Sequence, residues 1–360
     1  MNPLVTVICA VWNRQKDKEA LLRGHMANLQ QQTMAHEVVY VFDEGDAAPD
    51  WLAGSKVSAS EALTIYQAWN VALSLVRTPF VMNLNLDDRL APNAIELLQN
   101  VLDYSALADG SLAGFYPKLQ VFSIPYLFSS EAVAWNVFDG PFADKLRDDM
   151  RAATGLRALG LAQNGFRVFS NNVRAMKSPA DMKGVRIRTM ESPVYMEFVK
   201  SLGATAVPMG FPELINSLQQ GVVDGQENAP NDILDTGIVR VQKYVSLNNH
   251  IMGLQVILTN EKWFQSLTPT QRRIIQDGAR FHATMLNALK TNAAVESVEK
   301  IKATGAQVYA NTPDEKAQFR SQSQQAVRAY LEKQVGAQLV QDLLTDVQRA
   351  EREVYGAAPA

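Results

Sequence analysis

Strand-like and helix-like patterns of apolar residues alternate along the first part of the chain. The apolar, β-rich runs occupy residues 5–12, 37–42 and 80–84, and the helical patterns occupy residues 16–32, 60–76 and 92–102. A βαβαβα order of this kind predicts a parallel sheet with helices packed on its faces. The run at residues 5–8 carries no charged side chain, which fits a strand buried on both faces.

The pattern changes near residues 104–114, where periodicity lapses into small and polar residues before a segment rich in Phe, Tyr and Pro. We therefore expect two parts, residues 1–103 and residues 104–360. The second part predicts further strand–helix units, and Ser192-Pro193 and Thr268-Pro269 are typical helix starts. Its expected elements are a helix near 130–153, strands near 157–161, 167–170 and 185–189, a helix from 193, a long helix to about 304 and two amphipathic C-terminal helices.

Composition and charge narrow the class of protein. The 360 residues are 47% hydrophobic and 20% charged, which excludes collagen, coiled coil and wholesale disorder. The net charge of −3 argues against a protein that binds nucleic acid by neutralising phosphates. Residues 1–103 hold 7 basic and 12 acidic residues, net −5, whereas residues 104–360 hold 27 and 25, net +2. The two parts therefore differ in charge as well as in pattern.

The single cysteine, Cys9, excludes an internal disulfide framework and a CxxC metal site. No run approaches the 18 or more apolar residues of a membrane span, so we expect no direct membrane insertion. The first residues lack a basic segment before their apolar run. We therefore expect no signal peptide, which as the chain is written would leave it in the cytoplasm.

A candidate anion site lies at the end of the predicted strand at residues 185–189. Arg186 and Arg188 alternate with apolar residues, so both point to one face, and Arg188 sits at the carboxyl end of the strand. Ligands of open α/β sheets bind at that end, where a guanidinium grips a carboxylate bidentately and a helix start at Ser192 adds free N–H groups. The alternative for such an arginine is a surface ion pair.

Ordered motifs of the second part resemble a known family. They are ADMKG at 180–184, LGAxxxPM at 202–209 and LQxGVVDGQEN at 218–228, with FYP at 115–117, IPYLF at 124–128, NGFR at 164–167 and LTP at 267–269. About 250 residues closely resemble the substrate-binding subunits of tripartite ATP-independent periplasmic (TRAP) transporters, which capture C4-dicarboxylates, other small organic acids or sialic acid.

The resemblance implies a role for five residues. Arg188 matches the arginine that binds the ligand carboxylate, Arg167 a second pocket arginine, and Asn228 an amide donor that closes over the ligand. Phe211 matches an aromatic wall residue, with core packing as its alternative, and Glu191 occupies a position that tunes specificity. We expect the lone His250 to be structural, since no second His, Cys or acidic cluster stands near it in sequence.

The resemblance also implies an α/β, bilobed, periplasmic-binding-protein-like fold of type II, here with a Rossmann-like βαβαβα segment at the N-terminus. It implies a non-enzymatic protein without cofactor that works in the periplasm and delivers a small carboxylate to membrane permease subunits. The usual first strands of the first lobe are missing from residues 104–360, because other sequence stands in their place.

Residues 1–103 resemble instead the nucleotide-binding half of a GT-A-fold glycosyltransferase. The resemblance rests on the segments at 5–14, 37–45, 67–72 and 83–90. It implies that Asp43 meets the nucleotide base and that Asp87 and Asp88 hold Mg²⁺ or Mn²⁺ on a nucleotide-sugar. Asn85 replaces the first acid of an Asp-x-Asp motif, and Asp87-Asp88 also fits an acidic turn that caps a helix.

Two functions from different classes therefore compete. The first is a solute-binding protein for a small organic acid. The alternative is a metal-dependent glycosyltransferase fragment fused to a non-functional binding-protein remnant. The catalytic base and acceptor half that such an enzyme needs would lie downstream of Asp87, where the binding-protein sequence stands. We therefore expect no enzymatic activity from this chain.

Overall fold

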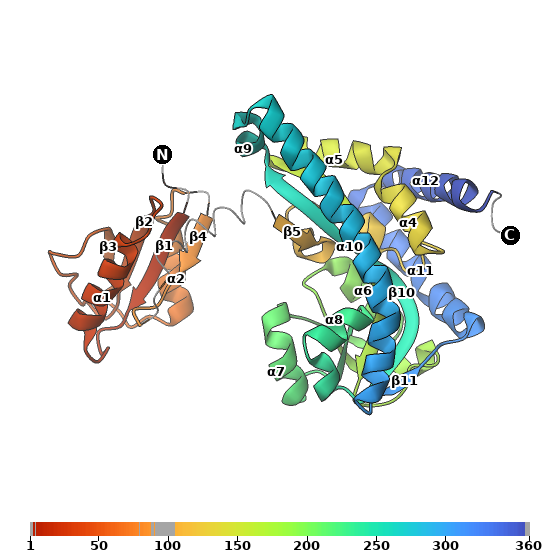
Figure 1. Cartoon of the computed structure of the whole chain (residues 1–360). Helices are drawn as coiled ribbons and strands as arrows, with labels where there is room; N and C mark the ends of the chain where they lie inside the picture. Colours follow the sequence, from red (N-terminus) through yellow and green to blue (C-terminus); the bar gives the residue numbers. More distant parts are fainter. Residues whose placement is uncertain (1–2, 4, 79, 88–89, 91–104, 357–360) are drawn as a thin grey trace. The chain divides into compact units, whose positions relative to one another are not determined.

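The computed structural model describes residues 3, 5–78, 80–87, 90 and 105–356. The chain forms two compact units, Met1–Asp103 and Tyr104–Ala360 (Figure 1). Each unit has its own sheet and its own hydrophobic core. In the part of the chain that the structure describes, no helix combines the length and the apolar character that a membrane span needs.

The first unit is built on a four-stranded parallel sheet in the order β3-β2-β1-β4. Its elements are β1 (Val5–Val11), α1 (Lys18–Gln30), β2 (Glu37–Phe42), β3 (Ser55–Ser58), α2 (Ile65–Leu73) and β4 (Phe80–Asn83). Cys9 packs in one core cluster with Leu22 of α1. Ile8 packs in another with Ala68 of α2. The two helices therefore cover opposite faces of the sheet, and every residue of β1 is buried.

The expectations for the first unit need two corrections. Strand β3 was not predicted, because its sequence is short and its side chains are largely exposed, so no apolar run marks it. Helix α2 is shorter than the pattern at residues 60–76 suggests, and it begins after the N-cap Thr64, whose side chain forms a capping box with Gln67. The helix expected at 92–102 lies outside the described residues.

The second unit contains a seven-stranded mixed sheet in the order β11-β10-β6-β9-β7-β8, with β5 paired to β10. The strands are β5 (Ser105–Ala108), β6 (Leu156–Asn171), β7 (Arg186–Thr189), β8 (Thr205–Pro208), β9 (Gly225–Asn228), β10 (Tyr244–Asn260) and β11 (Gln307–Tyr309). The helices are α4 (Glu131–Phe138), α5 (Pro141–Thr154), α6 (Pro193–Ser201), α7 (Leu214–Gln219), α8 (Pro230–Asp235), α9 (Glu261–Ser266), α10 (Pro269–Ala303), α11 (Pro313–Val335) and α12 (Ala337–Tyr355). The described residues of this unit also form short 3₁₀ helices, among them η1 (Asp109–Leu112), η2 (Pro117–Ser123) and η4 (Phe211–Glu213).

Two long antiparallel strands, β6 and β10, make this unit bilobed. The first half of β6 pairs with the second half of β10, which also pairs with β5. The second half of β6 pairs with β9, which continues the sheet to β7 and β8. One of the three register shifts in the β6–β10 pair follows Gly253, opposite Gly165, whose φ of +87° suits glycine. The predicted α/β bilobed class is thus confirmed, with one pair of strands shared by both lobes.

Several elements of the second unit differ from the expected ones. The strands expected near 157–161 and 167–170 are the two ends of one strand, β6. The single helix expected near 130–153 is two helices, α4 and α5, because Pro141 begins α5 after Gly140. Proline cannot donate the hydrogen bond that a continuous helix would require there. The long helix after Thr268 is confirmed as α10, with a complete capping box.

Candidate functional site

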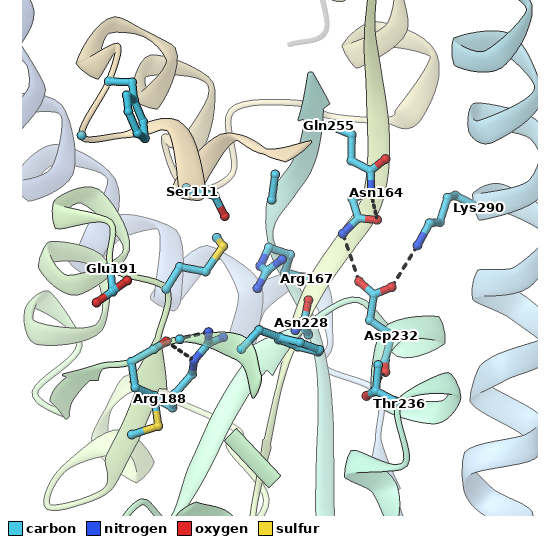
Figure 2. A pocket seen from close by; sticks show the side chains of 18 residues that line it. Ser111, Asn164, Arg167, Arg188, Glu191, Asn228, Asp232, Thr236, Gln255 and Lys290 are labelled. Atoms are coloured by element: carbon cyan, nitrogen blue, oxygen red, sulfur yellow. Dashed lines mark hydrogen bonds and ion pairs between the residues drawn. The ribbon is translucent and has the colours of Figure 1, made fainter. Parts of the chain in front are cut away.

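A pocket of about 600 Å³ lies in the second unit, where η1, β6, β7, β9 and α10 converge (Figure 2). The residues that line it are Ala108, Gly110, Ser111, Gly114, Phe115, Asn164, Arg167, Arg188, Met190, Glu191, Met209, Gly210, Phe211, Asn228, Asp232, Thr236, Gln255 and Lys290. All five binding residues expected from the sequence are among them. A cavity of this size with a few convergent polar groups is typical of a small-molecule site.

Arg188 is a buried cation of this pocket. It is 2% exposed near the end of β7, and its Nε and Nη2 donate to the carbonyl oxygen of Met209 at 3.1 and 2.8 Å. Its Nη1 is buried and has no hydrogen-bond partner in the described part of the chain. Burial lowers the pKa of Arg188 to about 10, although the nearby carboxylates of Glu227 and Glu191 oppose this. A buried guanidinium held in this way favours an anionic ligand.

Arg167 enters the pocket from β6 in a different electrostatic state. Its Nη2 donates to Oε1 of Glu227 at 2.9 Å, and its Nε donates to the other carboxylate oxygen at 2.5 Å. Burial by itself would lower the pKa of Arg167, but the adjacent Glu227 carboxylate raises it. Glu227 therefore fixes the orientation of Arg167 and neutralises its charge.

His250 lies behind the pocket and packs against two phenylalanines, which also stack on each other. Its ring stacks on Phe169 and Phe198 at centroid distances of 4.5 and 4.8 Å. Its Nε2 lies 3.4 Å from Glu227, and its Nδ1 lies 3.0 Å from Asn248. Burial lowers the pKa of His250, although Glu227 opposes this. The arrangement fits the structural role that the sequence suggested.

The three other expected residues also face the cavity. Asn228 is 5% exposed at the end of β9, where it lines the pocket. Phe211, in η4, is 45% exposed, and its ring centroid lies 5.7 Å from the guanidinium carbon of Arg188. Glu191 follows β7 and is exposed. Core packing, the alternative considered for Phe211, does not describe a ring this exposed.

Sequence reasoning missed several polar residues on the other side of the pocket, among them Asn164, Asp232, Gln255 and Lys290. Asp232 accepts hydrogen bonds from Lys290 Nζ at 2.9 Å and from Asn164 Nδ2 at 3.0 Å. Gln255 donates to the side chain of Asn164 at 3.4 Å. These residues come from β6, α8, β10 and α10, so no local spacing connects them. Only Asn164 carried a signal, because it stands in the NGFR motif.

The start of helix α6 is capped differently from what the sequence suggested. The helix begins at Pro193, but the Ser192 side chain makes no cap hydrogen bond. Instead Gln120, from η2, accepts hydrogen bonds from the Ser192 hydroxyl and from the backbone N–H of Val194. Gln120, 74 positions before Val194, therefore satisfies one of the free N–H groups at this helix N-terminus.

The residues expected to hold a nucleotide and a metal lie in the first unit. Asp43 follows β2, is 6% exposed and accepts a 2.7 Å hydrogen bond from the backbone N–H of Asn13. Asp87 is exposed, and Asp88 lies outside the described residues. Within the ranges that the structure describes, no group of three or more His, Cys, Asp or Glu side chains is placed to hold a metal ion.

Both lobes share the strands β6 and β10, and the pocket is polar with two buried arginines. These features define a class, the type II solute-binding proteins. Residues 92–334 match the model of the bacterial extracellular solute-binding proteins of family 7. A solute-binding protein of Verminephrobacter eiseniae is 34% identical over 249 residues, 69% of this chain and 72% of its own length. The chain belongs to this family, the solute-binding proteins of TRAP transport.

Other relatives and solved structures agree with this assignment. The 2,3-diketo-L-gulonate-binding periplasmic protein YiaO of Escherichia coli is 28% identical over 207 residues, 58% of this chain and 63% of its own length. The sugar acid binding protein DctPAm of Advenella mimigardefordensis, solved with galactonate, has a TM-score of 0.67 at 28% identity and covers 78% of this chain and 91% of its own. The structure of a TRAP periplasmic solute-binding protein from Bordetella bronchispeptica has a TM-score of 0.64, also at 28% identity, and the match covers 74% of this chain and 87% of the other.

The family match and the first unit overlap in only a few residues, since the match begins at residue 92. The comparisons therefore support the TRAP resemblance of the second part of the chain. They bring no support for the glycosyltransferase resemblance of residues 1–103.

Proposed function

We propose that this chain is a non-enzymatic solute-binding component of a TRAP-type system that captures a small organic acid in the pocket of its second unit. The ligand carboxylate binds Arg188, while Arg167 and Asn228 complete its hydrogen bonds. Phe211 forms an aromatic wall beside it, and Glu191 tunes which acid is accepted. The chain works in the periplasm without a cofactor and delivers its ligand to membrane permease subunits.

The observation that carries this proposal is the buried Nη1 of Arg188, which has no hydrogen-bond partner among the described residues. An unsatisfied donor of a buried cation costs several kcal/mol unless a ligand supplies an acceptor, so the group is well suited to an anion. Two oxygens of a carboxylate match the planar donors of a guanidinium. The ligands after which relatives are named or with which they were solved point the same way, namely galactonate, 2,3-diketo-L-gulonate and C4-dicarboxylate.

Isothermal titration calorimetry with succinate, D-galactonate and pyruvate tests the proposal. We expect at least one acid to bind the wild-type protein and to be recovered unchanged. Arg188→Ala should lose about 2 kcal/mol or more of binding free energy, roughly thirty-fold in Kd, because it removes one partner of a buried charge pair. An absence of heat with every acid, or unchanged binding by Arg188→Ala, contradicts the proposal.

Arg186→Ala is the matched control for this experiment. Arg186 lies on the same strand, but its side chain is 46% exposed and is paired with Asp224 at 2.6 Å. Its loss removes the same charge from the protein without changing the pocket. Acid binding by Arg186→Ala should therefore equal that of the wild type.

A further inference from the structure

The side of the pocket opposite Arg188 is a polar wall, which we call the far wall and define as Asn164, Asp232, Gln255 and Lys290. Figure 2 shows Arg188 and Glu191 on one side, the far wall on the other, and Arg167 and Asn228 between them. The Asp232 and Lys290 side chains are only 20% and 15% exposed. Their hydrogen-bonding groups are therefore largely shielded from bulk water, and both residues line the pocket.

The charges of the two sides differ in a way that limits the ligand to one carboxylate. On the far wall, the carboxylate of Asp232 and the ammonium of Lys290 are paired at 2.9 Å. The charge of Arg167 is likewise neutralised by Glu227. Among the pocket-lining residues that the structure describes, this leaves Arg188 as the cation without an ion-pair partner.

A second carboxylate on the ligand would meet a like charge. To reach the ammonium of Lys290 it would have to compete with Asp232, whose oxygens already accept from Lys290, Asn164 and Asn231. Placing like charges side by side in a shielded site is unfavourable. The far wall therefore disfavours a ligand with an acid at each end.

A hydroxyl group suits the same wall. It donates one hydrogen bond and accepts two, so it can donate to the Asp232 carboxylate and accept from Lys290 or Asn164. The ammonium of Lys290 has three donors, of which one is used by Asp232. A site of polar groups that expects a hydroxyl discriminates strongly against an analogue without it, because its own groups then lose their partners.

We propose that the pocket selects polyhydroxy monocarboxylates over dicarboxylates, with hydroxyl groups of the ligand on Asp232, Lys290 and Asn164. This inference rests on the proposed function, in which Arg188 holds the single carboxylate. Asp232 and Lys290 are then the residues that determine specificity.

Calorimetry with two ligands of equal carbon number tests the inference. D-galactonate has one carboxylate and a chain of hydroxyl groups, whereas adipate has a carboxylate at each end; succinate serves as a shorter dicarboxylate. We expect D-galactonate to bind at least about tenfold more tightly than adipate and succinate. Equal or tighter binding of a dicarboxylate by the wild-type protein overturns the inference.

Two far-wall variants separate charge selection from a general loss of structure. Asp232→Asn should weaken D-galactonate at least about tenfold and strengthen adipate, because it leaves Lys290 free to pair with a second carboxylate. Lys290→Gln should weaken both ligands, since the unpaired Asp232 then repels the dicarboxylate more strongly. If both variants bind every acid more weakly by the same factor, Asp232 and Lys290 have a merely structural role and the inference is overturned.

Arg188→Ala distinguishes failure of the inference from failure of the proposed function. If Arg188→Ala binds none of the acids and the wild-type protein prefers dicarboxylates, the proposed function stands and the inference alone is rejected. Unchanged binding by Arg188→Ala rejects both. Circular dichroism and thermal unfolding of each variant verify that it is folded.

Discussion

At the scale of single residues, three arginines of the second unit show how surroundings decide what a charged side chain can do. Arg186 is exposed and paired with Asp224, and Arg167 is buried and paired with Glu227. Arg188 is buried without an ion-pair partner among the described residues, and one of its donors is unsatisfied. Residue type is the same in all three, but only Arg188 has both a net charge and a free donor to offer a ligand.

Asp109, in η1 beside the pocket, is a second buried group with an unusual ionisation. Its carboxylate accepts a 2.5 Å hydrogen bond from the Ser123 hydroxyl, and it is 1% exposed. Burial raises the pKa of Asp109 from 3.8 to about 6, against the opposing effects of Ser123 and Arg167. The folded state therefore binds this proton more tightly than the unfolded state does.

This difference predicts a pH dependence of stability. Because the pKa is raised in the folded state, Asp109 stabilises the protein at low pH, and the contribution is lost as pH rises from roughly 4 to 6. The free energy of unfolding of Asp109→Asn, taken relative to that of the wild type, should increase by up to about 3 kcal/mol from pH 4 to pH 7. Urea unfolding at both pH values measures this. A constant difference between the two proteins would contradict it.

At the scale of elements, the antiparallel pair of β6 and β9 depends on a glycine at the start of β9. A Cβ added to Gly225 would lie 2.3 Å from the backbone oxygen of Ser170 and 2.6 Å from Cβ of Asn171, both on β6. The close approach holds β9 in the sheet and so positions Asn228, the last residue of the same strand, at the pocket.

Gly225→Ala should therefore destabilise the protein by about 1–3 kcal/mol, because the neighbouring backbone must shift. Urea denaturation followed by circular dichroism measures the change. Gly278→Ala is the matched control, because Gly278 lies inside helix α10 and a Cβ added there would have no neighbouring atom within 4 Å. That change should stabilise by up to about 1 kcal/mol. Equal effects of the two substitutions would reject the steric argument.

At the scale of the whole molecule, the described residues that line the pocket all belong to the second unit. Saturation with an acid ligand should therefore raise hydrogen-exchange protection in segments that contain Arg188, Asn228 and Lys290, because the ligand binds the folded state only. Mass spectrometry of exchanged peptides measures this. Peptides of residues 5–78 should not change with the acid, and acid-dependent protection confined to them would contradict the assignment of the pocket.

Much of the fold could be predicted from local patterns. The buried strands β1 and β2, the boundaries of α10 and the bilobed α/β class follow from apolar periodicity, helix caps and family motifs. Element lengths were predicted less well. The continuity of β6 was missed because its polar middle interrupts the apolar pattern, although β10 pairs with it along the whole length. The break between α4 and α5 depends on Pro141, which the periodicity alone does not reveal.

The sequence by itself determined the family of the second unit and the arginine at the end of β7, because motifs and strand alternation are local properties. Only the tertiary structure decided that Arg188 lacks an ion-pair partner in the described chain, whereas Glu227 neutralises Arg167. It also brought Asp232 and Lys290, 58 positions apart, into one ion pair on the far wall. Charge pairing across a pocket depends on distances between side chains of different elements, which no local pattern encodes.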